Sequence, residues 1–255
     1  DLSGTVFLGC LLDPKTLPKV IERGALVFPP FMGLPFSPYR GSLYSPEELY
    51  AGFDPERPES YADTLDARVY AHWSASGGAN PPSILETLAQ RLHDHAVTDA
   101  LEEALVEQGQ PRRVVAIMGG HSMQRGQENY RAVATLARSL ARLGFFLVSG
   151  GGPGAMEATH LGAWFAGRSE GELDEALTVL ARAPDYTHRE WLARAFEVRA
   201  RWPVLEEHRG ISDSLGIPTW LYGHEPPNPF ATRIAKYFAN SVREDGLLAI
   251  ARGGI

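Results

Sequence analysis

The residues best suited to bind a ligand lie in one glycine-rich segment, residues 148–158, which reads VSGGGPGAMEA. Glycines let the backbone approach a ligand closely, and the N-terminus of a following helix carries about half a positive charge. Several N–H groups converge at such a turn, so we expect it to bind an anionic group, with phosphate as the favoured ligand. A tight structural turn is the alternative, because it uses the same glycines. The candidate binding residues are Gly150, Gly151, Gly152, Pro153, Gly154, Ala155, Met156 and Glu157.

Four further candidates follow the preceding apolar run: Gly119, Gly120, His121 and Ser122. If that run is a strand of a parallel sheet, its carboxyl end lies at the edge where such sheets bind ligands. We expect the Ser122 hydroxyl to donate a hydrogen bond to phosphate. The His121 side chain either contacts a base or caps the next helix, and the sequence favours neither.

The same pattern narrows the class of phosphate ligand. Gly150, Gly152 and Ala155 match the G-x-G-x-x-A pattern of dinucleotide sites, but the turn follows the second strand of its unit, and no strand ending in an acidic residue follows at the required distance. NAD binding is therefore disfavoured, and a Walker loop is excluded because no Gly-Lys-Ser/Thr occurs. We expect no cofactor and no metal, since His93 and His95 lie two apart on a predicted helix and cannot share a face.

The elements that must position these residues form a strand and helix repeat. Apolar runs at residues 113–118 and 145–148 predict buried strands, and helical spacing predicts helices over 128–143 and 155–166. This order implies a parallel sheet with right-handed crossovers. We therefore expect an α/β fold, a doubly wound parallel sheet of the Rossmann-like type. The remaining predicted elements are a strand at 217–222, helix over 229–242 and a fourth strand at 247–251.

The chain divides into two predicted regions. Residues 1–110 are expected to form an N-terminal α+β region of unclear role, and residues 111–255 the Rossmann-like domain. Within that domain, residues 168–210 carry apolar side chains at helical spacing and predict two amphipathic helices that cap the site or contact a partner subunit. In residues 2–12 a bulky side chain recurs every five positions, which indicates either a weak pentapeptide repeat or an irregular apolar strand.

Charge and cysteine content exclude several classes of protein. The 255 residues include 31 acidic and 24 basic side chains, a net charge of -7, so the attraction to nucleic acid or anionic lipid is missing. The single cysteine favours a reducing compartment. No apolar run approaches the roughly 20 residues of a spanning helix, and no signal-peptide pattern opens the sequence. We expect a cytoplasmic protein that binds neither nucleic acid nor a membrane.

Four segments carry a family resemblance: the strand ending in MGGHS, the helix ENYRAVATLARSLARLGF, the turn SGGGPGAMEATHLGA and the later FATRIAKYFANSVREDGLL. They resemble the LOG (Lonely guy) family, also described as lysine-decarboxylase-like Rossmann nucleotide-binding proteins. The resemblance covers residues 113–167 and 215–255. It implies hydrolysis of the N-glycosidic bond of nucleoside 5′-monophosphates, giving free base and ribose 5-phosphate, by a homodimer or higher homo-oligomer with its site near the subunit interface.

The resemblance also implies roles for individual residues. The family's second turn, Pro-Gly-Gly-x-Gly-Thr-x-x-Glu, carries its catalytic glutamate and does not occur in these residues, so we expect the sequence to stop before it. Arg243 takes the place of the family's catalytic arginine, although Glu244 stands where the family has lysine; the alternative is a surface arginine paired with an acidic neighbour. Glu157 resembles a recurrent position of the GGGPG-type members, or only caps its helix.

Two other functions remain open at this point. A nucleotide-binding or sensing protein without hydrolysis would account for the long N-terminal region, the 168–210 insertion and the missing glutamate turn. An NAD-dependent dehydrogenase is the third reading. Decarboxylation through pyridoxal phosphate is rejected, because Lys236 is the only lysine outside the N-terminal region.

Overall fold

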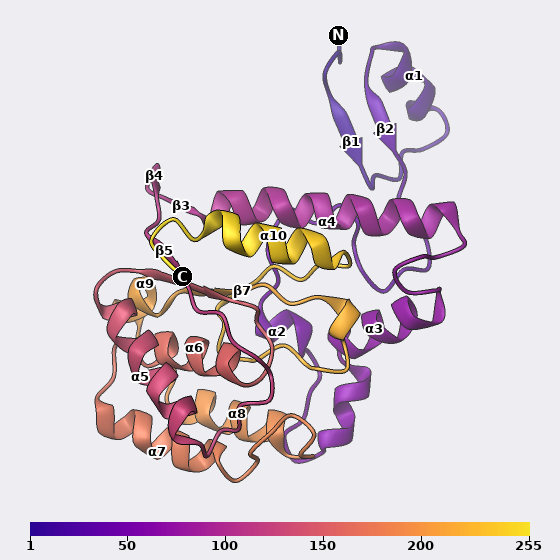
Figure 1. Cartoon of the computed structure of the whole chain (residues 1–255). Helices are drawn as coiled ribbons and strands as arrows, with labels where there is room; N and C mark the ends of the chain where they lie inside the picture. Colours follow the sequence, from indigo (N-terminus) through magenta and orange to yellow (C-terminus); the bar gives the residue numbers. More distant parts are fainter.

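A four-stranded parallel sheet lies at the centre of the computed structural model, which describes residues 1–255 (Figure 1). The strands follow one another in the order β5, β6, β7, β8, and each neighbouring pair is parallel. Their bounds are Val114–Ala116 for β5, Phe146–Ser149 for β6, Ser214–Gly216 for β7 and Arg233–Ile234 for β8. Every residue of β5, β6 and β7 is buried, as expected of parallel strands covered on both faces. The predicted α/β class with a parallel sheet is confirmed.

Helices cover both faces of this sheet (Figure 1). On one side lie α5 (Glu128–Arg142) and α6 (Ala155–Trp164), and on the other lie α4 (Ile84–Ala104) and α10 (Asn240–Ile250). The two crossover helices α5 and α6 approach closely at Gly162, which has no side chain. A Cβ at this position would lie 2.3 Å from the carbonyl oxygen of Ala134. Both helices begin at the predicted residue, Glu128 and Ala155.

The last third of the chain departs from the prediction. The strand predicted at 217–222 lies earlier, as β7, and Trp220–Tyr222 forms the short 3-10 helix η3, since Pro218 has no N–H for a strand ladder. The helix predicted over 229–242 is wrong over most of its length, because β8 lies within it and α10 begins only at Asn240. The strand predicted at 247–251 is also wrong, because α10 runs to Ile250 with Leu247 buried and Leu248 exposed, the one-sided burial of a helix.

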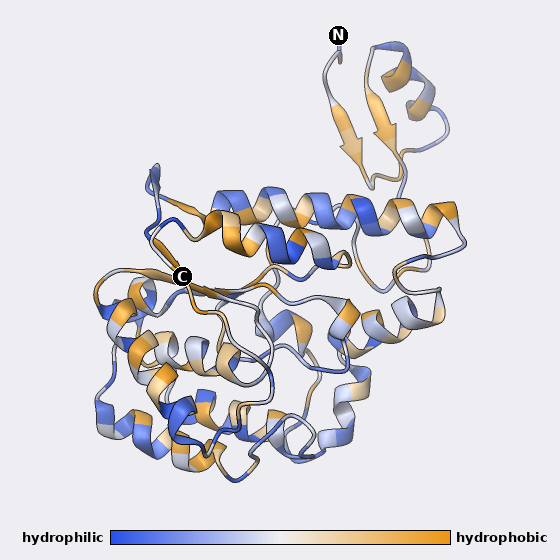
Figure 2. Cartoon of the chain, in the orientation of Figure 1, coloured by the Kyte–Doolittle hydropathy of each residue, from blue (hydrophilic) through white to orange (hydrophobic).

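The first strand pair stands apart from the central sheet (Figure 1). Strands β1 (Val6–Leu8) and β2 (Leu26–Phe28) are parallel and are joined by α1 (Thr16–Glu22), so the irregular-strand reading of residues 2–12 holds. Both strands are coloured as hydrophobic in Figure 2, and both ends of each are exposed. No helix in the structure is both long enough and apolar enough to span a bilayer.

The rest of the N-terminal region is built into the core of the sheet. Its helical elements are α2 (Pro46–Leu49), η1 (Pro58–Asp63), α3 (Leu65–Ala75) and α4, and the hairpin of β3 (Val106–Glu107) and β4 (Gln110–Pro111) follows. Tyr44 and Ile234 exchange two backbone hydrogen bonds at the edge of β8. Tyr44, Val97, Leu215 and Trp220 belong to one buried apolar cluster. Residues on both sides of position 110 therefore share one core.

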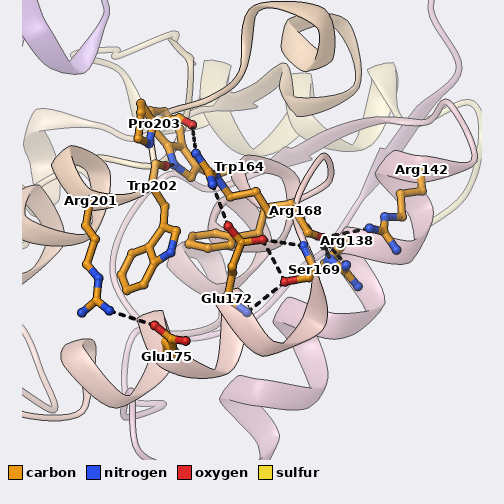
Figure 3. A network of polar contacts seen from close by, with 11 residues as sticks. Arg138, Arg142, Trp164, Arg168, Ser169, Glu172, Glu175, Arg201, Trp202 and Pro203 are labelled. Carbon is orange, nitrogen blue, oxygen red and sulfur yellow. Dashed lines mark hydrogen bonds and ion pairs between the residues drawn. The ribbon is translucent and has the colours of Figure 1, made fainter.

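The 168–210 insertion contains the two predicted helices, α7 (Glu170–Leu180) and α8 (Trp191–Arg201), followed by η2 (Glu206–His208) and α9 (Arg209–Ser212). Figure 3 shows how polar contacts fasten it to α5 and α6. Arg168 donates to Glu172 at 2.8 Å and to the carbonyl of Pro203 at 2.6 Å, while the Trp164 indole donates to the carbonyl of Trp202 at 2.7 Å. These contacts fix both ends of the insertion.

His160, on α6, makes the stability of this fold depend on pH. Its ring is fully buried, with Nδ1 3.1 Å from Ser214 Oγ, and burial lowers the pKa of His160 to about 3. The unfolded chain takes up a proton on this side chain below about pH 6.5, whereas the folded chain does not until about pH 3. The contribution of His160 is therefore complete above pH 6.5 and is lost as the pH falls, by about 2 kcal/mol at pH 5.

We expect His160→Gln to reduce the decline of the unfolding free energy between pH 7 and pH 5, measured by urea denaturation. His95→Gln is the matched control, because the His95 side chain is 76% exposed. Equal losses of stability in the wild type and in the His160 variant would contradict the assignment.

Candidate functional site

The glycine-rich turn connects β6 to α6 at the carboxyl edge of the sheet, as predicted. Gly151 and Gly154 have φ angles of 76° and 74°, a region that favours glycine. A Cβ on Gly154 would lie 2.5 Å from Gly120 O, and one on Gly151 would lie 2.8 Å from Pro218 Cδ. Tight packing alone therefore requires glycine at these two positions.

The turn also contains hydrogen-bond donors that the protein does not use. Residues 150–154 are buried, yet no hydrogen bond is donated within the protein by the N–H groups of Gly150, Gly151, Gly152 or Gly154. Buried N–H groups are nearly always paired. The carbonyls are paired instead, because Asn228 donates to Gly151 O at 2.9 Å and to Gly152 O at 3.2 Å. The turn is thus held through its carbonyl acceptors, and four of its N–H groups have no partner in the protein.

The Met156 side chain lies over this turn. A Cβ on Gly150 would lie 2.6 Å from Met156 Sδ, and one on Gly152 would lie 2.9 Å from Met156 Cε. Methionine has three rotatable side-chain bonds and adapts readily to its surroundings. The thioether therefore occupies the space next to Gly150 and Gly152.

Arg243 reaches the turn from α10. Its Nη1 atom lies 3.6 Å from the position of a Cβ on Gly150, and its guanidinium lies 5.6 Å from the ring centre of Tyr222. Nη2 contacts Glu244 at 3.3 Å, while the buried Nε has no hydrogen-bond partner. The structure therefore places this predicted arginine, 20% exposed, beside the turn with donor capacity to spare.

The second predicted segment, residues 119–122, lies directly against the start of α6. A Cβ on Gly119 would lie 2.4 Å from Ala155 Cβ, and Ala155 N donates to Gly120 O at 3.2 Å. His121 and Ser122 are exposed beside this contact. The two strand ends that the sequence singled out are thus brought together.

His121 pairs with a carboxylate that the sequence interpretation missed. Its Nδ1 lies 3.2 Å from Glu225 Oε1, and its ring meets the edge of Tyr186, from the insertion, at 6.0 Å. A Cβ on Gly152 would lie 3.9 Å from Glu225 Oε2. The signal was present in the polar residues that follow the third strand, in HEPPNP, since this loop also lies at the carboxyl edge of the sheet.

Glu157 lies away from the ligand face of the turn. Its buried carboxylate accepts hydrogen bonds from Arg125 Nε at 2.9 Å, from Arg125 Nη2 and from the Tyr130 hydroxyl at 2.9 Å. Arg125 also donates to the carbonyls of Ala183 at 3.3 Å and Trp191 at 2.9 Å, in the insertion. Burial and the Glu157 carboxylate hold the pKa of Tyr130 well above its usual value. The carboxylate therefore joins α6 to the insertion.

Asp94, on α4, fixes the start of the helix that carries Arg243. Its Oδ1 accepts from the N–H of Phe238 at 2.9 Å and its Oδ2 from that of Ala239 at 2.8 Å, immediately before α10. A carboxylate there satisfies two free donors and interacts favourably with the helix dipole. His93 Nδ1 lies 3.1 Å from the same carboxylate. A residue of the N-terminal region thus orients α10.

Replacing Asp94 by alanine is expected to lower the unfolding free energy by about 2 to 3 kcal/mol, because two charge-assisted hydrogen bonds are lost and their donors stay buried. Urea denaturation measures the change. Asp99→Ala on the same helix, with a side chain 62% exposed, is the control and should change stability by less than about 0.5 kcal/mol. Equal effects of the two substitutions would refute the role of Asp94.

A large cavity lies elsewhere, where β7 and β8 begin. It has a volume of about 920 Å³ and is lined by charged side chains that include Arg112, Arg233 and Asp213. These charges neutralise one another, with Asp213 2.9 Å from Arg112 Nη1 and 3.0 Å from Arg233 Nε. We therefore assign the candidate site to the glycine-rich turn, where donors are unpaired.

The turn, Arg243 and the exposed residues 121 and 122 form a donor-rich site at the carboxyl edge of a parallel sheet, suited to an anionic group. No group of three or more His, Cys, Asp or Glu side chains is arranged to hold a metal ion. Among known proteins, no family model matches the chain, and no curated sequence matches it.

Proposed function

We propose that the protein binds nucleoside 5′-monophosphates and, as a phosphoribohydrolase of the LOG type, hydrolyses their N-glycosidic bond. The proposal includes a doubly wound, Rossmann-like arrangement of the sheet, a cytoplasmic location and a homo-oligomeric state. It combines the resemblance of residues 113–167 and 215–255 with the chemistry available at the turn.

The observation that carries the proposal is the set of four unpaired N–H groups, in buried residues of the turn, beside the Arg243 guanidinium. A phosphate monoester supplies the acceptors that these donors lack, and its charge favours both the N-terminus of α6 and an arginine. Each charge-assisted hydrogen bond contributes about 1.5 to 3 kcal/mol. The phosphate would then anchor the nucleotide with its ribose at the open edge of the sheet.

Hydrolysis at that position requires water to add to C1′ of the ribose while the bond from C1′ to the base nitrogen breaks and the base takes up a proton. The transition state resembles an oxocarbenium ion, which a nearby carboxylate stabilises. The resemblance assigns this carboxylate to the glutamate of the Pro-Gly-Gly-x-Gly-Thr-x-x-Glu turn. That turn does not occur in these 255 residues.

The direct test is to incubate the protein with AMP, GMP, CMP and UMP and to measure free base by chromatography. Release of base together with ribose 5-phosphate supports hydrolysis. Equilibrium binding of the same nucleotides is measured in parallel. A protein that neither releases base from any nucleotide nor binds one would refute the proposal.

A nucleotide-binding or sensing protein is the second candidate. It is favoured by the way the 168–210 insertion is fastened to α5 and α6, through Arg142 and Trp164. Saturable binding of a monophosphate without release of base would select this candidate over the hydrolase.

A further inference from the structure

The Glu225 carboxylate pairs with His121, after the end of β5, and lies near Gly152 of the glycine-rich turn. Glu225 belongs to the loop that follows η3, and its side chain is only 11% exposed. Its Oε1 lies 3.2 Å from His121 Nδ1 and 3.7 Å from His224 Nε2. Both imidazoles therefore lie within ion-pair distance of the same carboxylate oxygen.

The other oxygen, Oε2, faces the turn. It lies 3.9 Å from the position that a Cβ on Gly152 would occupy, and it accepts no hydrogen bond from the protein. An ionised carboxylate is an acceptor only, so its complement in a ligand is a hydroxyl or an N–H group. The turn and this oxygen therefore offer opposite chemistry side by side, with donors in the turn and an acceptor next to it.

A bare phosphate fits this combination poorly, because it would lie beside a second negative charge. A phosphate ester that carries hydroxyl groups close to its phosphate satisfies both parts. Ribose 5-phosphate and the nucleoside 5′-monophosphates have this arrangement, with the 2′ and 3′ hydroxyls on the ring that carries the 5′-phosphate.

We infer that Glu225, oriented by His121, accepts a hydrogen bond from a ribose hydroxyl of the ligand whose phosphate binds the glycine-rich turn, and so selects phosphorylated ribosides over bare phosphate. The inference rests on the proposed function and adds the sugar to it. Glu225 is a specificity-determining residue in this assignment, and His121 is a positioning residue.

Glu225→Gln provides a test in which two ligands respond in opposite directions. Loss of the charged acceptor is expected to weaken binding of AMP by about 10- to 100-fold. Loss of the negative charge is expected to leave binding of inorganic phosphate unchanged or to tighten it. Both dissociation constants are measured by isothermal titration calorimetry. A change that only loosens the loop would weaken both ligands together.

Two comparisons complete the design. Glu206→Gln makes the same change of charge at a side chain that is 76% exposed, and it should leave both dissociation constants unchanged. In the wild type, 2′-deoxy-AMP or 3′-deoxy-AMP should bind more weakly than AMP, and this preference should be smaller in Glu225→Gln, whose amide oxygen is an uncharged acceptor. Equal effects of Glu225→Gln on AMP and phosphate would overturn the inference and leave the proposed function standing. If the wild type bound neither AMP nor phosphate, the proposed function and this inference would fail together.

Discussion

Replacing Arg243 by alanine is expected to lower kcat/KM for release of base from a nucleoside monophosphate by about 100- to 1,000-fold. Removal of one preorganised hydrogen-bond donor that faces an anion in an enzyme site has an effect of this size. The guanidinium lies beside Gly150, and its Nε has no partner in the protein. Binding of inorganic phosphate should weaken in parallel, which calorimetry measures without reference to catalysis.

Two companion variants sharpen this experiment. Arg243→Lys keeps the charge but not the planar fork of donors, so it should recover only part of the loss. Arg201→Ala removes an exposed arginine that pairs with Glu175 at 2.8 Å, far from the turn in the insertion, and should behave as the wild type. A fully active Arg243→Ala protein would contradict a role in binding or catalysis and would support the alternative, a surface arginine paired with an acidic neighbour.

Replacing Arg125 by methionine is expected to destabilise the fold by about 3 to 5 kcal/mol, because it leaves the Glu157 carboxylate buried without its partner. The side chains of Arg125 and Glu157 are 1% and 0% exposed. The substitution also removes the bonds from Arg125 to the insertion carbonyls. Urea denaturation monitored by tryptophan fluorescence measures the loss.

The double variant Arg125→Met with Glu157→Met separates a buried charge from a general packing defect. Removing both charges together should recover most of the stability lost in the single variant, since an apolar pair of similar volume replaces a buried ion pair at little cost. A double variant as unstable as the single one would show that the charge of Glu157 is not the cause.

The sequence was sufficient for the part of the fold in which local pattern and burial agree. The strands β5 and β6 are continuous apolar runs, and a parallel strand buried on both faces requires such a run. The apolar run at 247–250 is ambiguous by the same criterion, because a short run suits a strand or a buried helix. In the structure this run is the end of α10, and the residues just before that helix donate to Asp94, a contact between positions 144 residues apart that no local pattern reveals.

The candidate site was predictable where residue type and conformation are linked. Gly151 and Gly154 are required by positive φ angles and close contacts, and they identify the turn. The direction of a side chain was not predictable, so Glu157 was assigned to the ligand although it faces Arg125. Glu225 follows no spacing rule and comes to the turn only through the path of the loop after β7.

The shared core of residues on both sides of position 110 means that the site does not fold independently of the first hundred residues. Trp220 and Ile234 are packed against Tyr44, and Asp94 starts the helix that carries Arg243. Cooperative unfolding of this core would dismantle the glycine-rich turn in the same transition. Any truncation that removes α4 would therefore disrupt the candidate site at a distance, by unfolding the scaffold that holds the turn.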